Sequence, residues 1–250
     1  MTVSLYLIVA LGAIVAGFVQ GLSGFAFGLV AMSFWAWTVD PKLAAVLSTF
    51  GALTGQVIAA FTARRRFDKA LLAPFVIGGL VGLPVGVWLL PRLDVPIFKA
   101  CLGGLLLIWC PTMLMARNLP RVTAGGRAAD AIAGWLGGIC GGIGGFTGPI
   151  PTLWCTLRGF EKDVQREVIQ NFNLSMLAVA FSLYVSSGLV SLSMLPMLGL
   201  VALAVLVPVL VGARLYVGIS HEAFRKIVLG LLTASGIALL ASSVPVLLAR

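Results

Sequence analysis

The chain has 250 residues, of which 60% are apolar and 10% are charged, and its formal net charge is +9. Soluble domains carry roughly 25% charged residues, so this composition excludes an ordinary soluble protein and indicates a membrane protein. The positive charge does not indicate nucleic-acid binding, because the cations are dispersed among short loops between apolar runs, where they orient a membrane protein.

The first apolar run, residues 5–39, is too long for one membrane helix of about 20 residues and short for two. Gly17, Gly21, Gly24 and Gly28 interrupt it. Because glycine weakens a helix interior, we expect a broken, re-entrant hairpin whose arms have about 15 residues each. Three simple membrane spans are expected to follow, at residues 43–63, 70–90 and 97–116.

The second half of the chain repeats this pattern. A glycine-rich hairpin is expected at residues 128–157, where Pro149 and Pro151 also remove helix donors. Spans are expected to follow at residues 168–187, 194–217 and 223–248. Ala16–Gly24 aligns without gaps on Ala133–Gly141, and Gly28 then falls on Gly145. This duplication predicts a first repeat at residues 1–117, a linker at 118–127 and a second repeat at 128–250.

Loop charges orient the two repeats. The loops at residues 64–69, 117–130 and 214–226 are basic, and the positive-inside rule places them in the cytoplasm, next to the bacterial inner membrane. Each half then has a hairpin that enters and leaves on one side, followed by three crossings, so the second half is inverted relative to the first. The expected fold is all-α: a polytopic membrane protein with two inverted repeats, each a glycine-broken hairpin plus three transmembrane helices.

The two glycine-rich stretches resemble the signature of the sulfite exporter TauE/SafE family of bacterial membrane permeases. They read GFVQGLSGFAFG at residues 17–28 and GWLGGICGGIGGFTGP at residues 134–149. The first copy departs from the family pattern, since Phe25 and Phe27 stand where glycines are usual and no proline follows. The resemblance covers essentially the whole chain, and it implies export or uptake of sulfite, sulfonates, organosulfur acids or related small carboxylates.

The broken hairpins also provide candidates for an anion site. Where a helix restarts after a break, its first N–H groups lack partners and its dipole is positive, which suits an anion. We expect the two breaks to face each other near the membrane midplane. The predicted substrate-binding residues are Gln20, Ser23, Gly24, Thr49, Gly141, Gly144, Gly145, Thr147, Gly148, Asn171 and Asn173.

Close helix packing is the alternative interpretation of the glycines, and hydrogen bonding between helices is the alternative for the polar residues. Exposed backbone is the favoured interpretation for the dense stretch at residues 141–148. Packing is favoured for the glycines at helical spacing, which are Gly17, Gly21, Gly134 and Gly138.

The expected function is that of a secondary transporter or facilitator that moves a small anion, in the export direction. No Asp or Glu lies inside a predicted span, so no carboxylate proton relay is evident. The sequence has no enzyme, metal or cofactor motif, so neither an enzyme nor a cofactor is expected. The expected partners are the small anion and the lipid bilayer, with a homo-oligomer left open. The alternative is a non-transporting membrane scaffold or accessory subunit.

Overall fold

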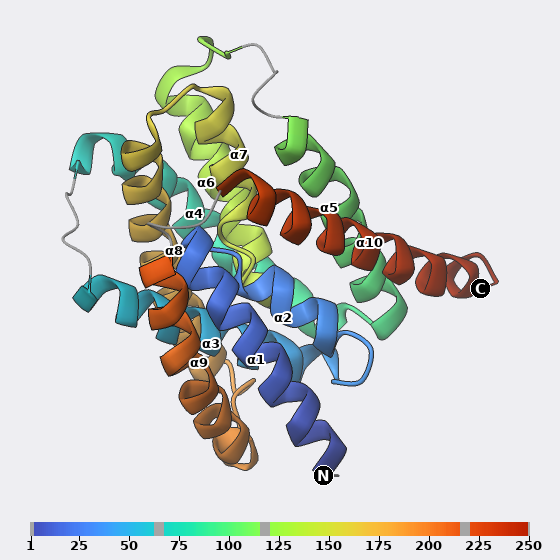
Figure 1. The fold of residues 1–250 in the computed structure, drawn as a ribbon. Coiled ribbons are helices and arrows are strands. Elements are labelled where there is room, and N and C mark those ends of the chain that lie inside the picture. Colours follow the sequence, from blue (N-terminus) through green and yellow to red (C-terminus); the bar gives the residue numbers. More distant parts are fainter. Residues whose placement is uncertain (1–2, 63–67, 116–120, 216–220, 250) are drawn as a thin grey trace.

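The computed structural model describes residues 3–62, 68–115, 121–215 and 221–249, and every regular element in them is a helix (Figure 1). The first half contains α1 (Val3–Ser23), α2 (Phe27–Trp35), α3 (Pro41–Thr62), α4 (Lys69–Leu89), the short helix η1 (Leu90–Arg92) and α5 (Val95–Met115). The second half contains α6 (Gly126–Gly144), α7 (Pro149–Leu157), α8 (Lys162–Ser186), the short helix η3 (Leu192–Met194), α9 (Leu195–Leu215) and α10 (His221–Leu248).

The expectation of an all-helical chain with several membrane crossings is confirmed. Seven helices in the described ranges are long and apolar enough to cross a membrane, α1 among them. Their outer faces carry apolar side chains: Leu7 is 59% exposed, Ile108 72% and Leu203 75%. Such a surface would be unfavourable in water and is ordinary against lipid, where a helix also satisfies its own backbone hydrogen bonds.

Both predicted hairpins are present, but their arms are unequal. α1 has 21 residues against 9 in α2, and α6 has 19 against 9 in α7. The expectation of arms of similar length is therefore wrong. Each hairpin breaks at a late glycine of its glycine-rich stretch, at Gly24 and at Gly145, whose φ angles are 86° and 76°. Glycine adopts this left-handed conformation without strain, and it commonly ends a helix in this way.

Two helix pairs join the halves of the chain: α4 packs along α6, and α1 packs along α9. Three glycines of α4 lie against backbone carbonyls of α6, namely Gly78, Gly82 and Gly86. The packing interpretation is supported for the four glycines to which it was given, because a Cβ on any of them would meet backbone atoms of the opposite helix. These four are Gly17, Gly21, Gly134 and Gly138.

Replacing Gly82 with alanine is expected to destabilise the protein. The new Cβ would collide with the carbonyl oxygen of Trp135 and lie 2.9 Å from its carbonyl carbon, so α4 and α6 would have to separate. Overpacking of this kind costs about 1–3 kcal/mol, and each kcal/mol lowers the melting temperature of a chain this size by roughly 2–4 °C. Gly199→Ala on α9 is the matched control, because its Cβ would have no atom within 4 Å. An equal effect of both substitutions on thermal unfolding in detergent would contradict this account.

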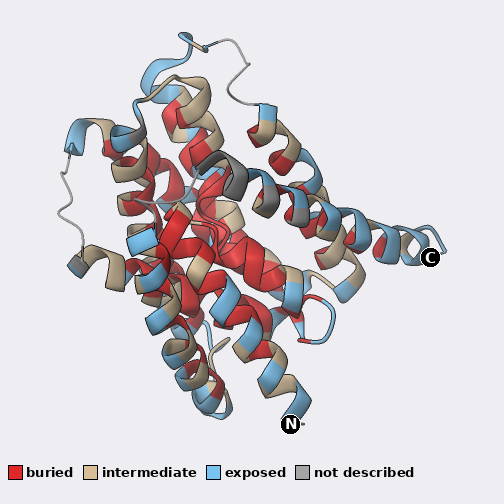
Figure 2. Ribbon diagram, in the orientation of Figure 1, coloured by how far each residue is buried: buried red, intermediate tan, exposed pale blue. Residues whose placement is uncertain are grey.

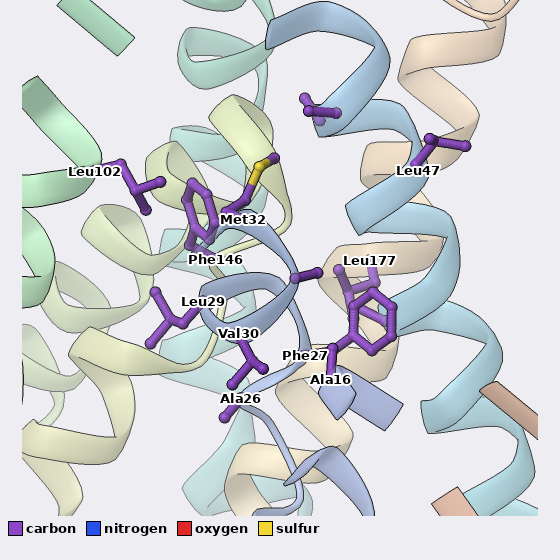
Figure 3. Close-up of a cluster of buried hydrophobic side chains, with 14 of the residues drawn as sticks. Ala16, Ala26, Phe27, Leu29, Val30, Met32, Leu47, Leu102, Phe146 and Leu177 are labelled. Carbon is purple, nitrogen blue, oxygen red and sulfur yellow. The ribbon is translucent and has the colours of Figure 1, made fainter. Parts of the chain in front are cut away.

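The short helix α2 lies in the middle of the core. Of its 9 residues, Phe27, Gly28, Leu29, Val30, Ala31, Met32 and Trp35 are buried. Figure 2 shows buried residues gathered around this helix, with exposed residues on the outer faces. Figure 3 shows α2 side chains beside Phe146 of the second hairpin. α5 and α10 pack together at one side of the molecule, on the right in Figure 1.

Charged residues differ from expectation in two places. α8 begins at Lys162, not near residue 168, so it includes a charged segment. The candidate membrane span Asp163–Ser186 contains Asp163 and Glu167, so the expectation that no acidic residue lies in a span is wrong. Asp130, near the start of the predicted second hairpin, lies inside α6 and is 3% exposed. Its burial is possible because its carboxylate is 2.9 Å from Arg158 and accepts the indole N–H of Trp154 over 2.7 Å.

The basic loops predicted at residues 64–69, 117–130 and 214–226, and the linker at 118–127, fall partly outside the described residues.

Candidate functional site

Each hairpin changes direction at a short break between its two helices. The first break, residues 24–26, joins α1 to α2, and the second break, residues 145–148, joins α6 to α7. The glycine that ends the longer helix is Gly24 in the first hairpin and Gly145 in the second. The gapless sequence alignment instead pairs Gly24 with Gly141, which lies one helical turn before Gly145. Glycines one turn apart lie on the same helix face, so the sequence pattern is similar for both alignments.

A narrow cavity lies beside the first break. Its volume is about 30 Å³, which is room for about two water molecules. Residues of α1, α3, α8 and α9 line it, and its polar side chains are Gln20, Gln56, Gln170 and Arg166. The sequence analysis placed Gln20 in the site and left Gln56, Gln170 and Arg166 out of it.

Two glutamines lie next to the first break. Gln56 on α3 donates from Nε2 to the carbonyl oxygen of Gly24 over 2.6 Å. Gln170 on α8 lies beside the same glycine, since a Cβ on Gly24 would be 3.3 Å from Nε2 of Gln170. The amide of Gln56 thus supplies a hydrogen-bond partner at the carboxyl end of α1, where the helix itself provides none.

Gln20 is the third glutamine at the cavity, and it is 3% exposed. Its Nε2 donates to the carbonyl oxygen of Ala52 over 2.9 Å. Because a carbonyl only accepts hydrogen bonds, this contact fixes the orientation of the amide. The Oε1 atom then has no hydrogen-bond partner, and it lies over Gly55, another residue that lines the cavity.

Arg166 is the one charged side chain among the described residues that line the cavity. It lies in the second turn of α8 and precedes Gln170 by one helical turn, so both residues lie on the same helix face. The sequence analysis missed Arg166 because it began this span at residue 168, beyond the charged segment. The four-residue spacing of Arg166 and Gln170 is the signal that would have identified it.

The second break is packed and hydrogen-bonded to the same two central helices. The hydroxyl of Ser48 on α3 donates to the carbonyl oxygen of Gly144 over 2.8 Å. The hydroxyl of Thr147 donates to Oδ1 of Asn173 on α8 over 2.8 Å. None of these four residues is among those that line the cavity.

The two breaks contact each other through a pair of phenylalanines. Phe25 lies against Gly148, where a Cβ would be 2.7 Å from its ring, and it meets Trp109 edge-on with ring centroids 5.7 Å apart. Phe146 lies against Gly28, where a Cβ would be 3.1 Å from its ring. Each aromatic ring therefore occupies the space that a glycine of the other hairpin leaves open.

The structure divides the predicted site residues into groups. Gln20 and Gly24 line the cavity. The hydroxyl of Ser23 instead accepts two N–H groups in the first break, over 3.4 and 3.2 Å, and so stabilises the turn into α2. Asn171 is half-buried on α8. The remaining residues form the second break or pack against it: Thr49, Gly141, Gly144, Gly145, Thr147, Gly148 and Asn173.

In the part of the chain that the structure describes, no three His, Cys, Asp or Glu side chains are grouped closely enough to hold a metal ion.

Comparison with known proteins finds one family. The family model described as sulfite exporter TauE/SafE matches residues 9–239, which include both breaks, the residues that line the cavity and every predicted site residue. No curated protein and no solved structure matches the chain.

Proposed function

This chain belongs to the sulfite exporter TauE/SafE family and is a multi-pass membrane transporter; we propose that it carries a small anion, sulfite or a sulfonate, out of the bacterial cell across the inner membrane. The observation that carries the proposal is the cavity beside the first break, where one guanidinium and three carboxamides meet at the end of a broken helix. A scaffold subunit has no need of such a cavity.

An anion suits this cavity for electrostatic reasons. Arg166 supplies a positive charge, and no carboxylate lies among the described lining residues. A guanidinium presents parallel N–H groups that bind two oxygens of one oxyanion. Sulfite and sulfonates offer such pairs of oxygens.

The cavity is placed for loading from the basic side of the protein. Ala59, Arg166 and Ala213 line it, close to the end of α3, the start of α8 and the end of α9. The basic segments at residues 64–69 and 214–226 adjoin α3 and α9, and the positive-inside rule assigns them to the cytoplasm. An anion leaving a cell at about −100 mV gains roughly 2.3 kcal/mol per charge, so export needs no coupling ion.

The proposal includes two inverted repeats, and the helix pairs support it. α1 of the first half packs on α9 of the second, and α6, the counterpart of α1, packs on α4, the counterpart of α9. The glycine contacts between the paired helices correspond too. Gly21 of α1 lies against Gly212 of α9, and Gly142 of α6 lies against Gly86 of α4. α5 packs on α10 and α3 on α8, as counterparts about a two-fold axis do. Such symmetry allows the halves to exchange conformations, which is the basis of alternating access.

Exchange between the two breaks is the proposed transport step. In the described conformation the first break borders the cavity, and the second break is packed beneath Phe25. The symmetry-related conformation would open the second break, with its predicted site residues, and close the first. The contacts of Phe25 with Gly148 and of Phe146 with Gly28 would form the seal between the two sides.

Sulfite counterflow in proteoliposomes tests this function. Labelled sulfite is expected to accumulate in vesicles loaded with unlabelled sulfite, and an inside-negative potential is expected to accelerate efflux because net charge leaves. Protein-free liposomes are the control. Absence of counterflow with sulfite, sulfonates and small carboxylates, together with no thermal stabilisation by any of them, would favour the scaffold. Transport that ignored the imposed potential would refute the uncoupled, charge-moving mechanism.

A further inference from the structure

Gln20, which lines the cavity, carries a hydrogen-bond acceptor that a bare anion does not satisfy. Gln20 is 3% exposed, and its Oε1 has no hydrogen-bond partner. The amide cannot turn to offer a donor instead, because its Nε2 is held by the carbonyl of Ala52 at 2.9 Å. A buried acceptor without a partner is unfavourable. Anionic oxygens are acceptors as well, so they leave Oε1 unpaired.

Oε1 of Gln20 lies in the space that a side chain at Gly55 would occupy. Gly55 lines the cavity, and a Cβ on it would collide with Oε1 of Gln20. The carboxyl ends of α1 and α9 also lie at the cavity, through Gly24 and Ala213, and they add partial negative charge. The first break therefore combines one cation with several electronegative groups, a combination that suits one negative charge with a hydrogen-bond donor beside it.

We propose that the substrate is a monoanion that retains a hydroxyl group beside its anionic oxygens. This inference rests on the proposed anion transport and names the substrate class of the same site. Arg166 pairs with the anionic oxygens, and Oε1 of Gln20 accepts the hydroxyl hydrogen. A dianion would bring a second charge for which the described lining residues hold no cation. A simple alkylsulfonate would leave Oε1 of Gln20 unpaired.

Two probes that differ by one hydroxyl test the proposal. 2-Hydroxyethanesulfonate and ethanesulfonate carry the same single charge on the same carbon chain. In counterflow with the wild-type protein, KM is expected to be about three- to tenfold lower for the hydroxylated probe, the worth of one net hydrogen bond. Equal KM values would overturn the proposal. Transport of neither probe nor of sulfite would instead refute the proposed function, so the two failures are distinguishable.

Two variants then assign the acceptor. Gln20→Met keeps the side-chain length and removes Oε1, so the KM values for the two probes are expected to become nearly equal. Gln56→Met is the matched control, because that amide donates to Gly24, and it is expected to change both KM values by the same factor. Loss of the preference in Gln56→Met with its retention in Gln20→Met would overturn the assignment. If Gln20→Met does not fold, Gln20→Asn withdraws the oxygen by one methylene. This variant is expected to bring the KM values for the two probes closer together.

Discussion

Replacing Arg166 with glutamine is expected to lower kcat/KM for sulfite by about tenfold to a hundredfold, since a hydrogen bond to a charged group contributes about 1.5–3 kcal/mol. The substitution keeps a polar, hydrogen-bonding side chain in the second turn of α8 and removes the guanidinium, which carries the positive charge among the described lining residues. KM is expected to rise most, because the guanidinium acts on the bound anion. Counterflow measured over a range of sulfite concentrations provides both constants.

The control for Arg166 is Arg92, which stacks on the ring of Trp88 at 3.7 Å and is not among the residues that line the cavity. Arg92→Gln is expected to leave sulfite transport within about twofold of wild type, as surface substitutions usually cost under 0.5 kcal/mol. Arg166→Lys retains the charge without the planar fork and is expected to be intermediate. Wild-type transport by a folded Arg166→Gln protein would mean that the anion binds elsewhere.

Replacing Gly148 with valine is expected to lower the transport rate more than tenfold while the protein still folds. The Cβ alone would lie 2.7 Å from Cδ2 and 2.8 Å from Cβ of Phe25, and overpacking of this size costs about 1–3 kcal/mol. In the proposed mechanism the two breaks must move past each other at this contact, so the added methyl groups would block the exchange. The measurement is counterflow, with folded yield and thermal unfolding determined on the same preparation.

The double variant Phe25→Ala, Gly148→Val separates a blocked exchange from general damage. Removing the ring makes room for valine, so transport is expected to recover relative to Gly148→Val alone. Gly104→Val on α5 is the control, because a Cβ at Gly104 would have no atom within 4 Å, and transport is expected to persist. Loss of folded protein in Gly148→Val would show instead that Gly148 serves packing, which was the alternative interpretation of these glycines.

Local pattern was sufficient for the membrane assignment and for the existence of two broken hairpins. Composition and apolar run length report directly on partition into lipid. Clusters of glycine mark weak points in a helix whatever surrounds them. The family resemblance rested on the same local stretches, and the family model confirms it over residues 9–239.

The position of each break was less well predicted, because it depends on contacts between helices. Gly141 and Gly145 are both plausible helix ends from sequence, one turn apart. Only the structure shows that Gly141 remains helical and Gly145 takes the positive φ, with Thr49 packed against it. Either glycine can adopt a positive φ with little strain, so the residues of neighbouring helices that pack against them select which one does.

Burial of charge was the largest error of sequence reasoning at the site. Avoiding charged residues placed Arg166 outside the membrane segments, and the pattern did not show that Asp130, near the start of the predicted second hairpin, is buried. Asp130 is buried beside Arg158 at 2.9 Å, a partner 28 residues away. Arg166 joins the cavity because α8 starts early. The free energy of placing a charge depends on its partner, and partners that are distant along the chain are visible only in three dimensions.

The amino-acid sequence alone therefore determined that this protein lies in a membrane, that it is helical, that it has two glycine-rich hairpins and which family it belongs to. All of these depend on composition and short-range spacing. The tertiary structure decided which glycines contact another helix and which end one. It also brought Gln20, Gln56, Gln170 and Arg166 from three helices to one cavity. That meeting depends on the packing of helices far apart in the chain, and no local propensity encodes it.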